Sequence, residues 1–584
     1  FIHIKSMEKQ IYTLFLLLIA SFELINSRTI TTNDLHQALS EAEPGDSIEL
    51  KSGFYRNHGY ELKNGTSKNP MIIKSAPNAQ VYFIGKSNEC IFEAEHLEYV
   101  TFEGPMVLQG ALCGFKLMDS LHIRITKVSI YNMRQQAILM SGQFIFLLGN
   151  VIQGCVLENK ETAKRKTSGW NQCLAILGLS NGKFSSGINI SKNSISNSYG
   201  EALYFFKCSF CSAHGNNITN GLSANIYIDS STDMEFTRNI LRVDSTEYNN
   251  KYGKACGIAM SSDNYNSIEN IHIENNIIIG TRIGIYYFTK TTGGTYNNVF
   301  IYFNTLWNVD YTPLLFKSSG KNTNDSAIYG CEMINNFIYF SGAIEFEPKR
   351  AWEFTSNYFY GTSSVPKIYS DNYDTSSKAV SNLTLDSIFN QIRGCEDYYD
   401  SNLKPECLRP SPKPGIMQLY RTGTHIGYQP FSDIYACARS TYYPSIGAYE
   451  FPQECTEEVE LQNYTIYDVT FNITHCTSDN RVLKIIGYHC DWSAEKCAAM
   501  TENKNCIWTT TFYNAAKFKF QYKFAETIQN SLYKMENNFF RYFDGDYLSF
   551  IATNNSSGRY EGCDYETKGT ISNGKLIKEL LKEK

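Results

Sequence analysis

The stretch that decides the fold reads I-N-I-S-K-N-S-I at 188–195, C-S-A-H-G-N-N-I at 211–218 and M-E-F-T-R-N-I-L at 234–241. The three copies follow one another at a period of 23 residues. Apolar and polar residues alternate in each copy, as they do in a strand with one buried face. The sixth residue is always Asn (Asn193, Asn216 and Asn239), just before the next apolar residue, so we expect a bend there.

The same template recurs on both sides of this stretch. Its Asn returns at spacings of 21 to 43 residues, and the longer spacings predict coils that carry inserted loops. A repeat of about 20–30 residues built from short strands indicates a solenoid, because one coil alone cannot bury its apolar face. The additional copies place bends at Asn150, Asn276, Asn304, Asn336 and Asn357.

We therefore predict an all-β chain that forms a right-handed parallel β-helix, with the Asn residues stacked as a ladder along one edge. Asn suits a bend because it tolerates left-handed backbone, and its amide can bond the equivalent Asn one coil above and below. A leucine-rich repeat has a similar period. Its L-x-x-L-x-L signature is absent, however, and the apolar positions favour Ile, Phe and Tyr.

Length and composition restrict the function. A chain of 584 residues is too long for one compact core, so two domains are expected. Charged residues make up 19% of the chain, aromatic residues 14%, and the net charge is −5. This composition gives no basic surface for nucleic acid and suits uncharged or mildly polar ligands such as sugars.

The N-terminal residues predict a secreted, extracellular protein. A short charged lead from Met7 to Gln10 precedes an apolar run from Leu14 to Ala20, and small or polar residues end the segment at Ser27. Such a segment is typical of a signal peptide and is too short to span a membrane as a stable helix. No later stretch is apolar enough to span one. Nine N-x-S/T sequons and 17 cysteines are compatible with a glycosylated, disulfide-bonded protein.

Residues 29–60 predict an N-terminal cap for the first coil. Asn33 or Asp34 can begin a helix that runs through Ala42, Pro44-Gly45-Asp46 makes a turn, and a strand starts at Ser47. A helix at this position would cover the exposed edge of the solenoid.

Motifs in the first coils resemble a known family. The phrase A-L-S-E-A-E-P-G-D-S-I-E-L-K-S-G-F-Y (38–55) is followed by G-T-S-K-N-P-M-I-I-K-S (65–75) and V-Y-F-I-G-K-S (81–87). Together they resemble the N-terminus of pectate-lyase-like β-helix proteins, especially polysaccharide lyase family six, the chondroitinase B and alginate lyase group. The segment S-I-G-A-Y-E-F (445–451) is similar to the closing strand of such proteins. The resemblance implies a β-helix over 28–452 that acts on polysaccharide.

After Pro452 the sequence changes character. A linker at 453–467 leads to alternating strands that predict a small β-sandwich over 468–553, and 554–584 reads as a polar tail. The strand order resembles carbohydrate-binding module family 20, the starch-binding domain. That resemblance implies a starch-like α-glucan as ligand, with sugar contacts from Trp492 and Lys523. The family's second stacking tryptophan is not at its expected place, where Tyr533 or Met535 is nearest.

The strands that follow the Asn bends are expected to present a row of tyrosines. The residues predicted to point into the core are Leu203, Ile226, Ile258 and Ile285, which leaves Tyr204, Tyr227 and Tyr286 outward. Equivalent places in successive coils line up about 4.8 Å apart. Tyr rings can stack on the C–H faces of sugars while their hydroxyls bond sugar oxygens. The alternative is an ordinary exposed ladder in a chain that is rich in Tyr.

Glu201 and Asp229 lie close to this row and are the candidate catalytic acid and base, with Asp263 as a third carboxylate. Glycoside hydrolysis needs two carboxylates about 5–10 Å apart, and adjacent coils can supply them. The alternative is that each carboxylate is solvated and has no catalytic role.

The resemblance to family six implies a different active site. Lyases of that group use a lysine base, an arginine near the leaving oxygen and often Ca²⁺, which draws charge from the uronate carboxylate. The nearest match is A-I-E-F-E-P-K-R (343–350), where Glu345 and Glu347 would hold the metal and Lys349 and Arg350 would be catalytic. The lysine comes farther beyond the acidic pair in the family. The alternative is a solvated charge run at the end of a coil.

These features predict a secreted, monomeric protein that binds a polysaccharide, either a starch-like glucan or a uronate-containing chain. The leading hypothesis is an enzyme that cleaves glycosidic bonds by elimination or hydrolysis. The alternative is a non-catalytic glycan-binding secreted or surface protein, because no complete catalytic set appears and a fold does not fix a function.

Overall fold

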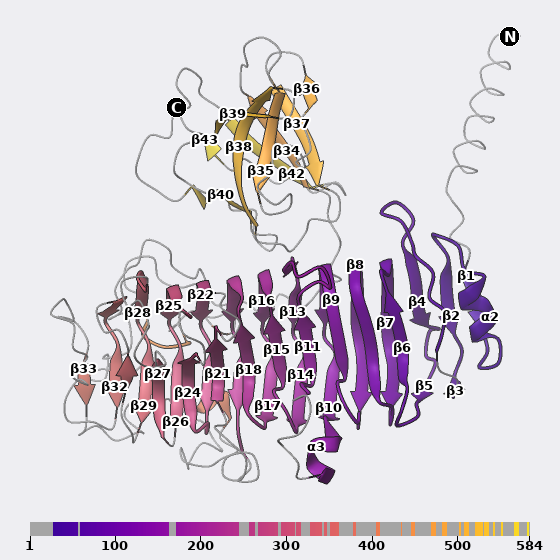
Figure 1. Ribbon diagram of the computed structural model, residues 1–584, viewed down its shortest axis with the longest axis horizontal. Coiled ribbons are helices and arrows are strands. Elements are labelled where there is room, and N and C mark those ends of the chain that lie inside the picture. The colour runs from indigo at the N-terminus through magenta and orange to yellow at the C-terminus, as the bar shows by residue number, and fades with distance from the viewer. Residues whose placement is uncertain are drawn as a thin grey trace, which may run out of the picture.

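The computed structural model describes residues 27–56, 59–162, 171–244, 256–262, 267–289, 294–309 and 311–316, shorter segments between 328 and 449, and separate strands between 469 and 582. The described strands from β1 to β33 form one long parallel β-helix, in which each strand pairs with its equivalent in the next coil (Figure 1). The predicted fold class is confirmed. Each coil contributes a strand to three faces, called here face A, face B and face C, in that order along the chain.

The bounds of the strands are as follows. Face A contains β6 (Cys90–Glu95), the first part of β8 (Cys113–Tyr131) and of β9 (Ile138–Leu148), β11 (Leu174–Leu177), β15 (Leu203–Phe206), β18 (Ala224–Asp229), β21 (Cys256–Ser261), β24 (Ile283–Phe288), β27 (Thr312–Phe316) and β30 (Glu345–Phe346).

Face B contains β1 (Ser27–Ile30), β2 (Ser47–Leu50), β4 (Met71–Ser75), the first part of β7 (Glu98–Gln109), the middle of β8, the end of β9, β12 (Ser185–Ser186), β13 (Asn189–Ser191), β16 (Cys208–His214), β19 (Thr232–Thr237), β22 (Ile268–Glu274), β25 (Tyr296–Tyr302), β28 (Cys331–Ile334) and β31 (Trp352–Thr355). Face C contains β3 (Gly53–Tyr55), β5 (Val81–Ile84), the ends of β7 and β8, β10 (Val151–Cys155), β14 (Ser194–Ser198), β17 (Asn217–Gly221), β20 (Ile240–Arg242), β23 (Ile277–Ile279), β26 (Thr305–Val309), β29 (Phe337–Phe340), β32 (Tyr358–Tyr360) and β33 (Lys378–Val380).

One apolar core fills the inside of the coils, from Leu35 near the N-terminal end to Phe359 in β32. The residues predicted to point inward from face A do so: Leu203, Ile226, Ile258 and Ile285 are fully buried and pair with one another in register. Fully burying a side chain of this size contributes roughly 1.5–3 kcal/mol. The stack of inward residues therefore supplies a large part of the stability of the solenoid.

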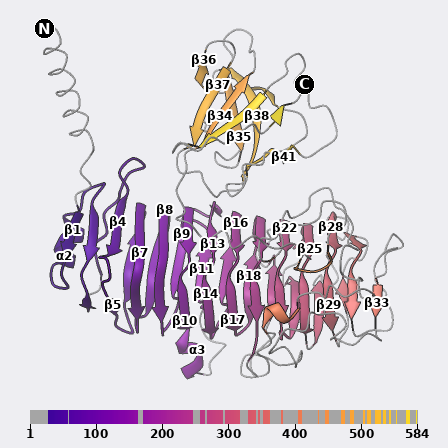
Figure 2. The same ribbon diagram turned by 180° about the vertical axis from the view of Figure 1, so that it is seen from behind.

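A short helix caps the N-terminal end, as predicted. Helix α2 (Leu35–Ser40) lies beside β1 and β2 at that end of the solenoid in both views (Figure 2). It buries Leu35, Ala38 and Leu39 against the first coil. The helix is shorter than expected, since it ends at Ser40, and the Asp34 side chain does not cap it because that carboxylate accepts a hydrogen bond from Thr31 instead. A second short helix, α3 (Leu157–Thr162), projects from the edge of the solenoid after β10.

The predicted Asn ladder is present between faces B and C. In each step the side-chain nitrogen of one Asn donates to the side-chain oxygen of the next, at 3.0 Å from Asn193 to Asn216 and 2.9 Å from Asn216 to Asn239. The same amide also donates to a backbone carbonyl of the preceding coil, as Asn216 does to Ile190 at 2.8 Å. The ladder runs without interruption through Asn150, Asn193, Asn216, Asn239, Asn276, Asn304, Asn336 and Asn357, all of them buried.

Left-handed backbone at the ladder Asn was one of the two reasons for expecting Asn at the bend, and the structure shows that this reason is wrong. The residue in left-handed conformation is the one before the ladder Asn, with φ between 53° and 63° in every coil: Gly149, Lys192, Gly215, Arg238, Asn275, Phe303, Asn335 and Ser356. The Asn is selected because its amide satisfies buried backbone groups. The left-handed backbone lies at the preceding position, where several residue types occur.

A second left-handed corner, which the sequence did not predict, lies at the start of face B. Its residues have φ between 51° and 68° and belong to successive coils: Tyr99, His122, Phe144, Gly187, Phe210, Asp233, Asn270, Asn298 and Gly330. The His122 ring stacks between Tyr99 at 4.5 Å and Phe144 at 4.8 Å. Farther along, Asn298 donates to Asn270 and Asn270 to Asp233, at 3.0 and 2.9 Å. Side chains at this corner therefore stack from coil to coil, as the ladder does.

The disulfide from Cys90 to Cys113 joins neighbouring coils, and the disulfide from Cys155 to Cys173 closes the segment that contains α3. Cys407, in the short helix η3 (Pro405–Leu408), is also disulfide-bonded. Among the described residues, four further cysteines are buried thiols outside these disulfides: Cys208, Cys211, Cys256 and Cys331. No helix within the described ranges is long and apolar enough to cross a membrane.

The C-terminal strands form two antiparallel sheets, each of the kind expected in a sandwich. One contains β34 (Val469–Thr474), β36 (Thr501–Asn503), β37 (Ile507–Phe512), β42 (Glu566–Ile571) and β43 (Leu581–Lys582). The other contains β35 (Val482–Gly487), β38 (Phe520–Ile528), β39 (Ser531–Met535), β40 (Arg541–Phe543) and β41 (Ile551–Ala552). Strands β42 and β43 come from the segment that was expected to be a tail.

We expect the substitution Asn216→Ala to destabilise the protein by about 3 kcal/mol or more. It removes the acceptor of the Asn193 backbone and side-chain N–H groups and the donor to the Ile190 carbonyl, and each buried polar group left without a partner costs about 1–3 kcal/mol. The matched control is Asn217→Ala, the next residue along, which is exposed and should change stability by no more than about 0.5 kcal/mol. Equilibrium denaturation of protein produced without glycans measures both. Equal small losses would contradict a structural role of the ladder.

The pH dependence of stability should contain a contribution from His122. Burial lowers the pKa of this imidazole from 6.5 to about 4. Between those values the unfolded chain binds a proton that the folded protein does not, so stability is full above pH 6.5 and falls by up to about 3 kcal/mol as the pH drops to 4. His122→Phe should keep the ring stack, since Phe144 already occupies the same conformation, and should flatten this part of the curve. Parallel wild-type and variant curves between pH 7 and 4 would contradict the assignment.

Candidate functional site

Strand register on face A aligns one outward residue from each coil into a single row. Starting from the N-terminal end, the row is Glu93, Lys116, Leu139, Ala175, Tyr204, Tyr227, Ala259, Tyr286, Leu315 and Glu345. The three tyrosines predicted to share a row therefore do share one. A second row lies two residues farther along the same strands and contains Phe206, Asp229, Ser261 and Phe288.

The two rows together build a continuous aromatic surface, called here the aromatic platform, from Phe206, Tyr204, Tyr227, Phe288 and Tyr286. The Tyr204 and Tyr227 rings stack with centroids 5.2 Å apart, and Tyr286 stacks on Phe288 at 5.0 Å. Tyr227 and Phe288 are 6.1 Å apart and nearly parallel, at 10°. The platform therefore spans four coils with ring planes of similar orientation.

The platform can cross strand β21 because the two outward residues there are small. Ala259 and Ser261 occupy the positions that hold Tyr and Phe in β24, and both are buried beneath neighbouring side chains. The Tyr227 hydroxyl and the Ser261 hydroxyl are 2.8 Å apart, within hydrogen-bond distance. This bond holds the Tyr227 ring over β21, next to Phe288 of the following coil.

Exposure differs along the platform. Tyr227 and Tyr286 are partly exposed, whereas Tyr204 is only 9% exposed although it lies on the outer face. Its neighbours cover its ring, and burial raises the pKa of its hydroxyl well above the usual range, with a further rise from the Asp229 carboxylate. Tyr204 thus supports the platform and offers little surface of its own.

The two carboxylates proposed as acid and base lie at the edge of the platform. Asp229 is 5% exposed and accepts hydrogen bonds from the Ser230 hydroxyl at 2.8 Å and the Tyr204 hydroxyl at 3.4 Å. Glu201 is 6% exposed, and its charge also contributes to the raised pKa of Tyr204. The structure therefore brings Glu201, Asp229, Tyr204 and Tyr227 together, as predicted, but it buries both carboxylates rather than leaving them solvated.

The remaining predicted residues are only partly described. Asp263, Glu347, Lys349, Arg350 and Trp492 lie outside the described residues. Glu345 opens β30, in register with Leu315 on face A, and its side chain is not described. Lys523 in β38 and Tyr533 in β39 lie on neighbouring antiparallel strands, of which only the backbone is described. Within the described part of the chain, no group of three or more His, Cys, Asp or Glu side chains could hold a metal ion.

Phe206 and Phe288 were missed by the sequence analysis. Each follows a predicted platform tyrosine by two residues, so the alternation of strand side chains could have placed it on the same face. Three histidines on face B have structural partners: His122 stacks between two rings, His214 lies 2.6 Å from the Thr237 hydroxyl, and His272 lies 3.0 Å from Glu274. They are not part of this site.

The sequence matches no known protein family and no curated protein. Its structure is similar to that of several solved proteins. Pectate lyase Pel9A is 14% identical, with 73% of this chain and 96% of that chain covered and a TM-score of 0.41. The PL6 family alginate lyase AlyGC is 15% identical, with 66% and 58% covered and a TM-score of 0.39. PfbA, a surface adhesin of Streptococcus pneumoniae, is 14% identical, with 56% and 85% covered and a TM-score of 0.40. Similarity at this level does not assign an activity to this chain.

Proposed function

We propose that this chain is a polysaccharide-binding protein and that the aromatic platform on face A is its glycan-binding surface. The observation that carries the proposal is the stack of five rings across four coils, at centroid distances of 5.0 to 6.3 Å. Because these rings cover one another's faces, the platform offers ring edges and Tyr hydroxyls: sugar C–H groups can pack on the edges, and sugar oxygens can bond the hydroxyls. Because stacking and strand pairing already fix these rings, binding orders few side chains, which favours affinity.

Secretion belongs to the same proposal. It is supported by the signal-like segment before Ser27 and by the two disulfides of the β-helix, since such bonds form in oxidising compartments. The C-terminal sandwich is proposed to bind a starch-like α-glucan. Its support is the resemblance of the sequence around Trp492 and Lys523 to a starch-binding module and the pair of antiparallel sheets that the strands form.

A second candidate function is cleavage of the bound glycan. It is favoured by the position of Asp229 and Glu201, two carboxylates close enough to one tyrosine hydroxyl for both to raise its pKa. Hydrolysis needs such a pair beside the scissile bond. Elimination assisted by Ca²⁺ at Glu345 and Glu347, with Lys349 and Arg350, stays a prediction that the described residues do not test.

Binding is tested by affinity electrophoresis of the full chain in gels that contain starch, pectin, alginate, chondroitin, xylan or mannan. We expect retardation by at least one of them, and Tyr227→Ala should weaken that binding about fivefold or more, because removing one ring of the platform costs about 1 kcal/mol or more. The control is Phe54→Ala, which removes a ring that is 58% exposed on face C. Equal retardation of wild type and Tyr227→Ala on every polysaccharide would overturn the assignment of the site.

Cleavage is tested on any polysaccharide that binds, by following new reducing ends and the ultraviolet absorbance of an unsaturated product. If Asp229 is a catalytic carboxylate, Asp229→Asn should lower the rate of cleavage at least 100-fold. Removing a general acid or base usually costs about 100- to 10,000-fold in rate. Binding of the variant to the same polysaccharide should persist. Full activity in the variant would exclude that role, and a wild-type protein that binds without producing ends would favour the non-catalytic alternative.

A further inference from the structure

A pocket opens on face A at the N-terminal end of the solenoid, several coils away from the aromatic platform. It has a volume of about 360 Å³, at the small end of the range of about 300–1,000 Å³ for small-molecule sites. Its polar lining includes Glu89, Glu93, Lys116, Gln135 and Gln136, and its apolar lining includes Leu139. A mixture of amides, carboxylates and an aliphatic side chain in a small pocket is a suitable lining for a single polar, uncharged unit such as a sugar ring.

The pocket and the platform lie on one line. Lys116, Leu139, Ala175 and Tyr204 are consecutive partners in strand register, so the row that lines the pocket continues into the platform. Three steps of about 4.8 Å separate Lys116 from Tyr204, which is roughly 14 Å. Leu139 itself lines the pocket, and Ala175, which lies between it and Tyr204, is small and buried beneath its neighbours. A glycan chain that passes over Ala175 along the solenoid axis would contact the pocket and the platform at once.

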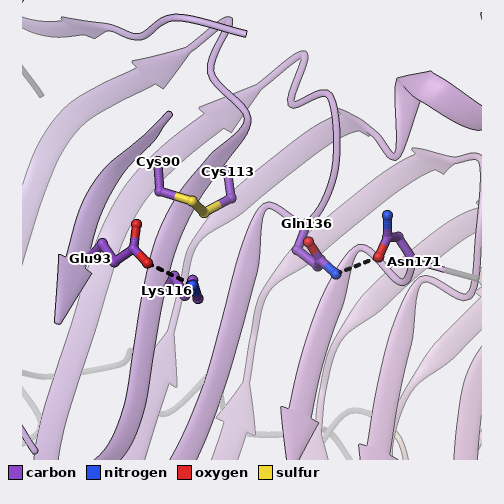
Figure 3. The surroundings of a disulfide bond; sticks show 6 residues. All are labelled: Cys90, Glu93, Cys113, Lys116, Gln136 and Asn171. Atoms are coloured by element: carbon purple, nitrogen blue, oxygen red, sulfur yellow. Dashed lines mark hydrogen bonds and ion pairs between the residues drawn. A yellow bond between two sulfur atoms is a disulfide. The ribbon is translucent and has the colours of Figure 1, made fainter. Parts of the chain in front are cut away.

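The charges beside the pocket are already paired within the protein. Lys116 Nζ lies 2.6 Å from Glu93 Oε1, and Lys86 Nζ lies 3.4 Å from Glu89 Oε1 (Figure 3 shows the first pair). A ligand carboxylate would have to compete with Glu93 for Lys116, the only cation among the described residues that line the pocket. Hydroxyl groups, by contrast, can donate to the carboxylates and bond the amides without breaking either pair. The pocket therefore favours an uncharged sugar over a uronate.

The pocket wall is held in place by covalent and hydrogen bonds. The disulfide between Cys90 and Cys113 joins the two strands that carry Glu93 and Lys116 (Figure 3). The side chain of Gln136 donates to Asn171 at 2.9 Å, and that of Gln135 donates to Glu158 of α3 at 3.1 Å. A pocket fixed in this way loses little freedom when a ligand binds.

We propose that this pocket is a subsite for an uncharged sugar unit of the same glycan that the aromatic platform binds, so that a neutral chain lies along face A parallel to the solenoid axis. This inference rests on the proposed function and makes it more specific. It names the class of ligand, a neutral glycan, and the direction in which the chain lies.

The test is calorimetric titration of the full chain with di- to hexasaccharides of xylan, mannan and starch and with hexagalacturonate. We expect one neutral series to bind more tightly than hexagalacturonate, with affinity increasing until the oligosaccharide reaches from the platform to the pocket. Leu139→Trp places a bulky ring in the pocket lining and should weaken the binding of the longest neutral oligosaccharide about tenfold, while leaving that of the disaccharide unchanged. Should Leu139→Trp not fold, Gln136→Ala serves the same purpose.

A charge variant tests the ligand class separately. Glu93→Gln keeps the shape of the side chain but releases Lys116 from its partner, so it should increase the affinity for hexagalacturonate and not that for the neutral chain. The variant Phe54→Ala on face C is the control in all titrations.

The outcomes separate the two proposals. If Tyr227→Ala weakens binding and Leu139→Trp and Gln136→Ala do not, the pocket is not a subsite although the platform binds glycan. If hexagalacturonate binds wild type more tightly than every neutral series, the ligand class is wrong. If none of these variants changes the binding of any glycan, the proposed function fails together with the inference.

Discussion

The structure depends on the hydrogen bond that passes from one Asn side chain to the next between faces B and C. Each amide also bonds the backbone of the coil before it. One side chain therefore satisfies several buried polar groups at the bend, where strand pairing does not reach them. Since the oxygen of Asn216 accepts from Asn193 and its nitrogen donates to Asn239, the three coils can stack in only one register. A shift of one residue would break every step and turn the apolar side chains outward.

That register determines what face A can do. It places Tyr204 and Tyr227, which are far apart in the sequence, in contact as stacked rings, and it lets small residues in β21 leave room for the platform to continue to Phe288. The same register extends the row toward Lys116 and the N-terminal pocket. A binding surface of this kind is assembled from one residue per coil, and loops between coils can vary without disturbing it.

The fold and the outline of the site were predictable because both follow from periodicity. The spacing of Asn193, Asn216 and Asn239 gave the coil length, and counting along each strand then placed the tyrosines on one face. The burial of Tyr204 was not predictable, because it depends on how the side chains of Phe206, Tyr227 and Asp229 pack around it. The pocket was missed because its wall combines strand positions with Gln136, whose side chain bonds Asn171, 35 residues away in the sequence.

The most direct test of the account is a crystal structure of the β-helix soaked with a neutral hexasaccharide that binds in solution. The account predicts continuous density for a sugar chain on face A, with rings over Tyr227 and Phe288 and the chain parallel to the row of stacked Asn residues. Density on face B or face C, or coordinates in which Asn193, Asn216 and Asn239 are not stacked, would contradict it.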